Sequence, residues 1–340
     1  MTDVAVNDRA APLLQVEQVR KLFPLKAPGR FLPFGAVRRT PLLHAVDGVD
    51  LSIGTGESVG LVGESGCGKS TLMRLITRTL DPTAGVIRFR GEDIAQIPAS
   101  AFARVPQRRL IQMVFQDPTD SLNPRYTARD TIAEPLRLLG NLSGAALRAR
   151  VDEVAALVQM PYELLGRFPH QLSGGQKARV GIARAVALEP SLLILDEPTA
   201  ALDVSVQAVI LHLLADLKEK LGMSYLFVSH DLDIVRLLCD RVMVMYLGRI
   251  VESGPARQVF ESPRHPYTRA LLSAIPGIAG GASRRIRLEG DPTSPIDPDP
   301  LRCRFHGRCP KGQDACTRSS PALVQVAPAQ DVACHFPEPA

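Results

Sequence analysis

The sequence contains no apolar run of the roughly 20 residues that a membrane-spanning helix needs, so no such helix is expected. Residues 1–11 include acidic side chains and have no apolar core, so no secretory signal peptide is expected. Only Cys67 and Cys239 occur before residue 303, so a disulfide-linked fold is not expected either. We therefore predict a cytosolic chain whose role at a membrane would come through partner subunits.

What the chain does contain is enough apolar material for a large core. It has 340 residues, of which 45% are hydrophobic, and a prior of about 150 residues per domain suggests two units. The net charge of +5 and the pI of 9.0 could indicate nucleic-acid binding. The phosphate-binding motifs described next account for the important anion contacts, so no nucleic-acid partner is predicted.

A basic segment without acidic residues lies between Glu17 and Asp47. Its prolines and glycines predict an extended surface insertion at residues 24–41. One hypothesis places it near anionic lipid headgroups, where each basic residue gains about 1 kcal/mol. The alternative is a solvated loop. The basic residues are Arg20, Lys21, Lys26, Arg30, Arg38 and Arg39.

A glycine-rich loop that follows a short apolar run and precedes a helical pattern is the most specific motif. The loop is Gly63-Glu64-Ser65-Gly66-Cys67-Gly68-Lys69-Ser70, which fits G-x-x-x-x-G-K-[ST], and Thr71 follows it. Its glycines let backbone amides approach phosphates, Lys69 reaches the β- and γ-phosphates, and the Ser70 hydroxyl is placed to bind Mg²⁺. The Thr71 hydroxyl can also donate to a phosphate. The alternative, a simple turn with an exposed lysine, does not explain the flanking strand and helix.

A second glycine-rich loop, Leu172-Ser173-Gly174-Gly175-Gln176, also leads into a helical pattern. A helix N-terminus has unpaired N–H groups and a partial positive charge, so each loop can receive phosphate oxygens. One nucleotide hardly needs both loops from a single chain. We therefore predict that the second loop serves a nucleotide bound by a partner subunit.

Two carboxylates end the apolar run at residues 191–196. The run is typical of a parallel strand covered on both faces, and ligands bind beyond the carboxyl ends of such strands. We expect Asp196 to hold Mg²⁺ and Glu197 to polarise the water that attacks the γ-phosphate. The alternative is a strand end with solvated acids. The next apolar run, residues 224–229, brings His230 to the same edge.

These motifs, together with Gln116 and Ala201-Leu202-Asp203, resemble an ATP-binding cassette (ABC) ATPase over residues 12–265. The resemblance implies an α/β fold of the P-loop NTPase type, with a mixed sheet, flanking helices and a helical lobe at about residues 117–185. It also implies a head-to-tail dimer in which Ser173, Gly174, Gly175 and Gln176 face the partner's ATP. The alternative class is a soluble ABC ATPase that acts on DNA or ribosomes.

Further roles follow from the same resemblance. It implies that Gln116 senses Mg²⁺ and the membrane domain, that His230 contacts the γ-phosphate, and that Asp203 links the two sites. It also implies an aromatic platform for adenine before the loop, and Phe23 is the candidate; the alternative is that Phe23 is a core residue. Residues 131–158 have helical periodicity interrupted at 140–144, which predicts at least two helices in the lobe.

The C-terminal part, residues 266–340, indicates which branch of the ABC ATPase family the chain resembles. Residues 263–272 resemble the segment that follows the cassette in oligopeptide and dipeptide importer ATPases. The resemblance implies ATP-driven peptide uptake at the cytoplasmic face of the inner membrane. The implied partners are a second ATPase subunit, two permease subunits and a solute-binding protein. Related importers carry nickel, haem or other small solutes, which remain alternatives.

Four of the six cysteines lie in this tail, at Cys303, Cys309, Cys316 and Cys334. A cysteine cluster in a cytosolic chain indicates metal or redox chemistry. The resemblance implies a structural 4Fe-4S cluster bound by the four thiolates. The alternatives are zinc, with His306 or His335 as a spare ligand, and four unligated thiols.

Overall fold

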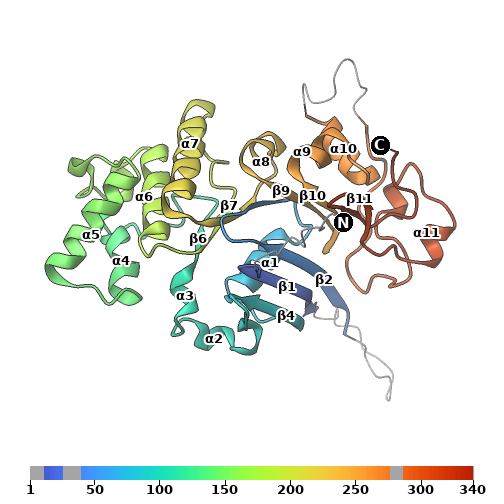
Figure 1. Cartoon of the computed structure of the whole chain (residues 1–340), viewed down its shortest axis with the longest axis horizontal. Helices are drawn as coiled ribbons and strands as arrows, with labels where there is room; N and C mark the ends of the chain where they lie inside the picture. The colour runs from blue at the N-terminus through green and yellow to red at the C-terminus, as the bar shows by residue number, and fades with distance from the viewer. Residues whose placement is uncertain (1–10, 26–39, 276–285, 340) are drawn as a thin grey trace, which may run out of the picture.

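The computed structural model describes residues 11–25, 40–275 and 286–339 (Figure 1). Its larger sheet has eight strands, and the five strands from β9 to β6 run parallel. The predicted mixed α/β sheet with flanking helices is thus confirmed. In spatial order the strands are β11 (Val324–Ala327), β12 (Gln330–Val332), β10 (Arg249–Pro255), β9 (Arg241–Tyr246), β3 (Ser58–Val62), β8 (Ser224–Val228), β7 (Leu192–Asp196) and β6 (Ile111–Val114).

The parallel strands are mostly apolar because both faces of the sheet are covered. Leu193 and Leu195 of β7 belong to one core cluster, whereas Leu192 and Ile194 belong to the other. Successive side chains of a strand point to opposite faces, so a strand buried on both sides has no polar alternation. All five residues of β3 and of β8 are buried. This explains why continuous apolar runs predicted these strands.

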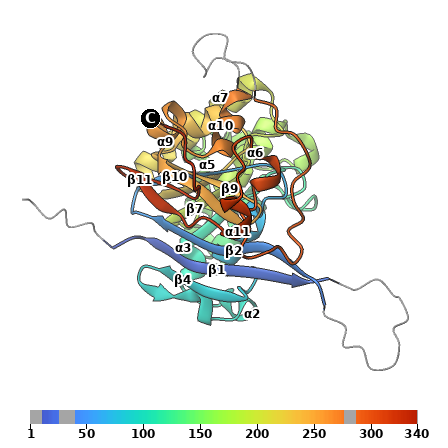
Figure 2. The same ribbon diagram turned by 90° about the vertical axis from the view of Figure 1, so that its right-hand side faces the viewer.

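A second, antiparallel sheet packs below the first (Figure 2). Its strand order is β2-β1-β4-β5, and β1 pairs with β2 from Leu14–Ile53 to Pro24–Leu42. The side chains of this sheet and of helix α1 form one apolar cluster with the lower face of the main sheet. The strands are β2 (Leu42–Ile53), β1 (Leu14–Pro24), β4 (Ala84–Phe89) and β5 (Glu92–Asp93), and α1 spans Lys69–Ile76.

The helices predicted between the two glycine-rich loops lie together at one end of the molecule (Figure 1). The structure has α4 (Ala128–Leu138) and α5 (Gly144–Leu157), which are separated close to the predicted interruption, and α6 (Gly174–Val186) packs beside them. The Thr127 side chain caps α4 in a reciprocal pair with Asp130, which satisfies N–H groups at the helix start. Two short helices, α2 (Ala99–Phe102) and α3 (Gln107–Leu110), precede β6.

The remaining helices cover the upper face of the main sheet. They are α7 (Val204–Leu221), α8 (Leu232–Leu238), α9 (Ala256–Glu261) and α10 (Pro266–Ser273). The last short helix, α11 (Ala315–Arg318), lies in the C-terminal part. Among the described residues, no helix is long and apolar enough to cross a membrane.

The C-terminal part is continuous with the main sheet. Strand β12 pairs with β10 through Glu252–Val332 and Ser253–Asp331, so the tail extends the main sheet. Phe305 is 2% exposed and belongs to the same apolar cluster as the helices above the sheet. The tail therefore folds on the core, because its own apolar side chains are too few to form a separate one.

Two of the sequence-based hypotheses fall on residues outside the described ranges. Most of the basic insertion at 24–41, including Arg30, Arg38 and Arg39, belongs to the segment 26–39. The segment considered for a signal peptide is residues 1–11, of which only Ala11 is described.

Candidate functional site

The first glycine-rich loop connects β3 to α1 at the carboxyl edge of the main sheet. Gly63 has φ 153° and Gly68 has φ 111°, values that favour glycine. A Cβ atom at Gly63 would lie 2.2 Å from the Met245 carbonyl oxygen, and one at Gly68 would lie 2.2 Å from that of Ala45. The backbone geometry and the close neighbours therefore both require glycine at these two positions.

The Lys69 side chain lies along the inside of this loop. Its Nζ donates to the carbonyl oxygens of Gly63 at 2.7 Å and Glu64 at 3.0 Å, and the side chain is buried. Cys67 is also buried, with its Sγ 3.8 Å from Lys69 Nζ, and burial raises the pKa of its thiol. The lysine ammonium thus lies among loop carbonyls that anionic oxygens could replace as partners.

The two carboxylates lie where β7 ends. Asp196 is its last residue, and Glu197 follows with φ 45°, a left-handed conformation that costs a non-glycine residue about 1 kcal/mol. The Glu197 N–H donates to the Val228 carbonyl oxygen of β8 at 2.9 Å, which holds this conformation. Strain of this kind is concentrated at functional sites.

Glu197 contacts two of the predicted site residues that come from other loops. Its Oε2 accepts a hydrogen bond from Gln116 Nε2 at 3.0 Å and lies 3.1 Å from His230 Nδ1. Gln116 follows β6 and His230 follows β8, so three neighbouring parallel strands bring these side chains together. The arrangement is a carboxylate held by an amide and an imidazole, which can accept a proton from water.

Burial, with the charge of Glu197 as a second cause, raises the pKa of Asp196 to about 6. Lys69 and Arg74 oppose this shift. A half-buried carboxylate next to a second carboxylate favours the binding of a cation, because a cation offsets both the lost hydration and the repulsion.

A cavity of about 470 Å³ lies between the loop and these acids. Phe23 lines it, so the predicted adenine platform is in the wall of the same cavity as Lys69. Its walls include several residues that the sequence did not indicate. The lining residues are Phe23, Leu43, His44, Ala45, Ser65, Gly66, Gly68, Lys69, Ser70, Thr71, Gln116, Asp196, Glu197, His230, Leu247, Gly248 and Pro295.

The second glycine-rich loop lies at the start of α6. Ser173 caps this helix by accepting from Gln176 N at 3.3 Å, and Gln176 Oε1 accepts from Ser173 N at 2.9 Å. A Cβ at Gly175 would lie 2.7 Å from Val206 of α7, whose N-cap is Asp203. The described residues that line the cavity include neither this loop, residues 173–176, nor Asp203. The structure thus brings these two predicted features together, away from the chain's own cavity.

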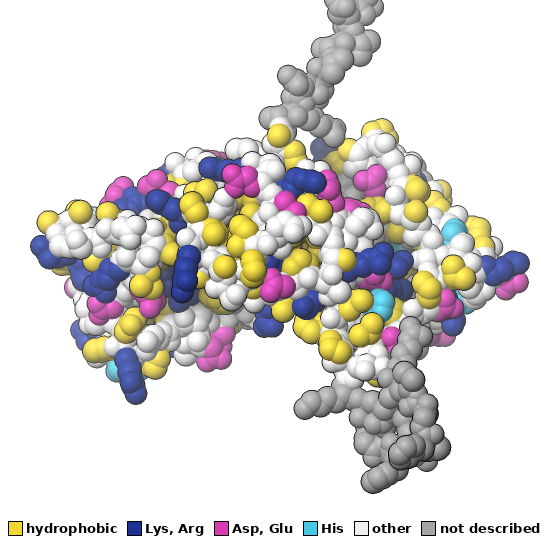
Figure 3. All heavy atoms as spheres, turned by 90° about the horizontal axis from the view of Figure 1, so that it is seen from below, with side chains coloured by type: hydrophobic (Ala, Val, Ile, Leu, Met, Phe, Trp, Pro, Cys, Tyr) yellow, Lys and Arg dark blue, Asp and Glu magenta, His cyan; other side chains and the backbone are white. Residues whose placement is uncertain are grey.

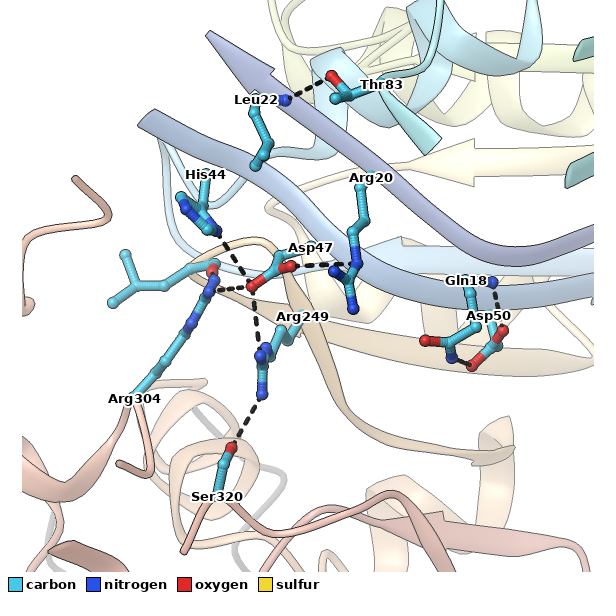
Figure 4. Close-up of polar contacts among 11 residues, drawn as sticks. Gln18, Arg20, Leu22, His44, Asp47, Asp50, Thr83, Arg249, Arg304 and Ser320 are labelled. Atoms are coloured by element: carbon cyan, nitrogen blue, oxygen red, sulfur yellow. Dashed lines mark hydrogen bonds and ion pairs between the residues drawn. The ribbon is translucent and has the colours of Figure 1, made fainter. Parts of the chain in front are cut away.

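A polar cluster outside the predicted site joins the tail to the core (Figure 4). Asp47 of β2 forms ion pairs with Arg304 of the tail, with Arg249 of β10 at 3.2 Å and with Arg20 of β1 at 3.6 Å. His44 Nδ1 lies 3.3 Å from the same carboxylate. Burial opposes ionisation, but Arg304 and Arg249 outweigh it and lower the pKa of Asp47. Nothing in the sequence indicated this cluster, since Asp47 is more than 200 positions from Arg249 and Arg304.

The predicted metal centre of the tail has no support in the structure. Within the described ranges, no group of three or more His, Cys, Asp and Glu side chains is placed to hold a metal ion. Burial, with the neighbouring thiols as a further cause, raises the pKa of Cys303, Cys309 and Cys334, that of Cys334 to about 11. The geometry of the described residues therefore gives no support for the predicted 4Fe-4S cluster or for the alternative zinc site. Cys303 and Cys309 instead pack against the main apolar cluster.

The geometry defines a P-loop nucleotide-binding ATPase, and comparison with known proteins identifies its family. Residues 46–200 match the model of the ABC transporter family, and residues 251–316 match that of the oligopeptide/dipeptide transporter C-terminal region. The chain is 44% identical over 327 residues to the oligopeptide transport ATP-binding protein AppF of Bacillus subtilis, covering 95% of this chain and 97% of that protein. The chain belongs to the ABC transporter family, in the branch that carries this C-terminal region.

Other similarities agree with this assignment. A Sinorhizobium fredii protein named "Probable peptide ABC transporter ATP-binding protein" is 45% identical over 96% of this chain and 91% of its own length. A dimeric ATP-binding cassette bound to ADP and Pi superposes with a TM-score of 0.62 at 29% identity, over 72% of this chain and 99% of that one. The structure of cbiO1 from Clostridium perfringens superposes with a TM-score of 0.61 at 33% identity, over 73% of this chain and 90% of that one.

Proposed function

We propose that this chain is the ATP-hydrolysing subunit of a peptide importer. The observation that carries the proposal is the contact of Glu197 with both Gln116 and His230 beside the loop that holds Lys69. This arrangement places a proton acceptor, the two polar side chains that hold it and a phosphate-binding loop around one cavity. The similarity to peptide-transport ATP-binding proteins supports peptides as the cargo.

Each side chain has a separate role in this proposal. Lys69 and the amides of residues 63–70 bind the phosphates, and Phe23 stacks on adenine. Ser70, Gln116 and Asp196 would hold Mg²⁺, which neutralises charge on the phosphates when bound. Glu197 orients and deprotonates the attacking water, while His230 keeps Glu197 in place and contacts the γ-phosphate.

The second glycine-rich loop supports a dimer of ATPase subunits. Residues 173–176 and Asp203 lie together outside the chain's own cavity, so a partner's nucleotide is the ligand available to them. The similarity to a dimeric cassette bound to ADP and Pi agrees with this arrangement. The partner ATPase is an identical copy or a paralogue.

The complete transporter would contain two permease subunits and a solute-binding protein, with this chain at the cytoplasmic face of the inner membrane. The helical lobe around α4 and α5 would contact the permeases, and the loop of Gln116 would couple that contact to the nucleotide. Basic and acidic side chains are interspersed on the face drawn in Figure 3, which favours this function over nucleic-acid binding. The proposal includes no iron–sulfur or zinc centre, because no described ligand group supports one.

The variant Glu197→Gln tests the proposal. It removes the proton acceptor but keeps a side chain of the same shape, so ATP binding should persist while hydrolysis falls at least about 100-fold. Glu219→Gln, on the exposed face of α7, is the matched control and should hydrolyse ATP like the wild type. If Glu197→Gln retains more than a tenth of the activity, Glu197 is not the general base.

The cargo is tested by a second experiment, in which the chain is assembled with the permeases in liposomes and its ATPase activity is measured with peptides. Nickel and haem are the competing solutes.

A further inference from the structure

The tail segment that contains Arg304 and Phe305 is anchored to the nucleotide core at two adjacent residues. Arg304 pairs with Asp47 and also donates to the Leu247 carbonyl oxygen. The Phe305 ring lies 5.2 Å from that of Tyr246 and 5.6 Å from that of Tyr267, and it is buried. Arg304 is held by an ion pair and Phe305 by aromatic packing, so two successive side chains fix the backbone of this segment against the core.

Three residues further on, Arg308 reaches the phosphate loop. Its Nη1 donates to Glu64 Oε2 at 2.8 Å and its Nη2 to Glu64 Oε1 at 3.1 Å, a bidentate pair. The Arg308 side chain is only 10% exposed. The guanidinium also lies 6.0 Å from the centre of the Tyr246 ring. The contact is therefore a partly desolvated ion pair whose geometry is fixed on both sides.

The backbone of the same glutamate is held as well. The Glu64 N–H donates to the Tyr267 hydroxyl at 2.8 Å, and the Glu64 carbonyl oxygen accepts from Lys69 Nζ at 3.0 Å. Tyr267 belongs to α10, which follows the cassette. Glu64 is thus bound through its side chain and its N–H by residues from beyond position 265, and through its carbonyl by the lysine that the phosphates require.

Glu64 also poses an electrostatic problem for the bound nucleotide. It belongs to the phosphate loop and directly precedes Ser65, which lines the cavity, although Glu64 itself is not among the lining residues. An unpaired carboxylate there would repel the triphosphate and would be free to move the loop. The bidentate pair with Arg308 removes both effects, because it neutralises the charge and fixes its position.

A second part of the tail lines the cavity directly. Pro295 lines the wall together with Phe23, and its carbonyl oxygen accepts from His44 N at 2.9 Å. Asp297 continues this pairing, since its N–H donates to the Leu42 carbonyl oxygen at 2.9 Å and its carboxylate accepts from Leu42 N at 3.1 Å. The tail therefore adds a short pairing segment to β2 and contributes Pro295 to the wall of the cavity that also contains Phe23, on which a base would stack.

We propose that the C-terminal extension is an integral part of the ATP site, in which Arg308 positions the phosphate loop through Glu64 and Pro295 lines the wall beside the base. The inference rests on the proposed nucleotide role of this cavity. It assigns binding-site residues to a segment outside the cassette. Arg308 is a positioning residue, since it acts through Glu64, whereas Pro295 would touch the base or ribose.

Arg308 is tested by charge removal and rescue in the purified full-length chain. Arg308→Gln leaves Glu64 unpaired and should weaken binding of a fluorescent ATP analogue about 10-fold, with a larger effect on KM than on kcat. The double variant Glu64→Gln/Arg308→Gln has no unpaired carboxylate and should return to within about threefold of the wild type. Arg302→Gln, which removes an exposed tail arginine, is the matched control and should bind normally. Unchanged affinity in Arg308→Gln, or no rescue in the double variant, overturns the role of Arg308.

Pro295 is tested with a ligand that has no base. Pro295→Gly should weaken ATP binding about threefold to tenfold and leave the affinity for inorganic tripolyphosphate unchanged, while Arg308→Gln should weaken both. If Pro295→Gly weakens the binding of both ligands equally, or of neither, the assignment of Pro295 to the base is wrong.

Lys69→Ala separates this inference from the underlying function: normal ATP binding in Lys69→Ala would refute the nucleotide site itself. A defect in Lys69→Ala without one in Arg308→Gln would refute only the role of Arg308.

Discussion

Asp47 of β2 and Arg304 of the C-terminal extension form a buried ion pair across 257 positions of the chain. The carboxylate is 7% exposed and the arginine 8% exposed, and Arg249 is the second cation against the same carboxylate. This contact joins the tail to the strand that also lines the nucleotide cavity through His44 and Ala45. Stability of the tail and the geometry of the cavity are thus connected.

Asp47→Asn should destabilise the protein by about 3 kcal/mol, because it leaves the buried guanidinium group of Arg304 without its counter-charge. The loss should appear in denaturant unfolding, together with faster proteolysis of the tail. Asp50→Asn is the matched control on the same strand, since Asp50 is exposed and contacts only Gln18 among the described hydrogen-bond partners. A loss below about 1 kcal/mol in Asp47→Asn would mean that the pair does not anchor the tail.

Gly68→Ala should prevent ATP binding and cost at least about 3 kcal/mol of stability. The new Cβ would lie 2.2 Å from the Ala45 carbonyl oxygen, and the backbone φ of 111° is strained for alanine. Gly56→Ala separates backbone strain from the clash. Gly56 has φ 73° and no heavy atom within 4 Å of the added Cβ, so this control should cost only about 1 kcal/mol. Equal losses in the two variants would exclude the clash as the cause.

His265 should make the protein sensitive to acid. Burial lowers the pKa of His265 to about 3, whereas the ordinary pKa of a histidine in an unfolded chain is 6.5. Between these values the unfolded state binds more protons, so the stability present above pH 6.5 is lost as the pH falls toward 3. The loss approaches about 1 kcal/mol per pH unit.

His265→Asn provides the comparison for that prediction. His265 Nδ1 caps α10 by accepting from Tyr267 N at 3.1 Å, and asparagine can supply the same kind of acceptor without titrating. Urea unfolding between pH 7 and pH 4.5 should show a smaller decrease in stability for the variant. A parallel decrease in both proteins would assign the acid sensitivity to other groups.

Asp196→Asn should stabilise the nucleotide-free protein while it abolishes Mg²⁺-dependent hydrolysis. Because the pKa of Asp196 is raised to about 6, the folded state binds more protons than the unfolded state between pH 4 and pH 6. Its contribution to stability therefore falls as the pH rises through this window. We expect about 1 kcal/mol in favour of the variant at pH 7.5 in EDTA, discounted for partial exposure, and no difference at pH 4. Lower stability of the variant at pH 7.5 would contradict the burial argument.

Much of the fold followed from local patterns. The apolar runs before Gly63, Asp196 and Ser229 became β3, β7 and β8, and the interruption near residue 140 separates α4 from α5. Such features depend on side-chain periodicity and on glycine conformation, which neighbouring residues determine. The parallel order of the strands then brought Glu197, Gln116 and His230 to one edge.

The position of the tail did not follow from local patterns. The pairing of β12 with β10, the contact of Arg308 with Glu64 and the place of Pro295 in the cavity all join segments far apart in sequence. The expectation that four cysteines form a metal centre also depended on such distances, and the structure gives no ligand group. A single sequence contains no information on which of many arginines meets which carboxylate.

The ATPase motifs could be identified from the sequence by itself. Phosphate binding requires glycine, lysine and carboxylates, and within each motif these residues stand at fixed short spacings. Only the tertiary structure decided that the C-terminal extension shares the core, and that Arg304 and Arg308 contact Asp47 and Glu64. The physical reason is that burial and ion pairing act through space. Their energies depend on distance and desolvation, and neither quantity is encoded in local periodicity.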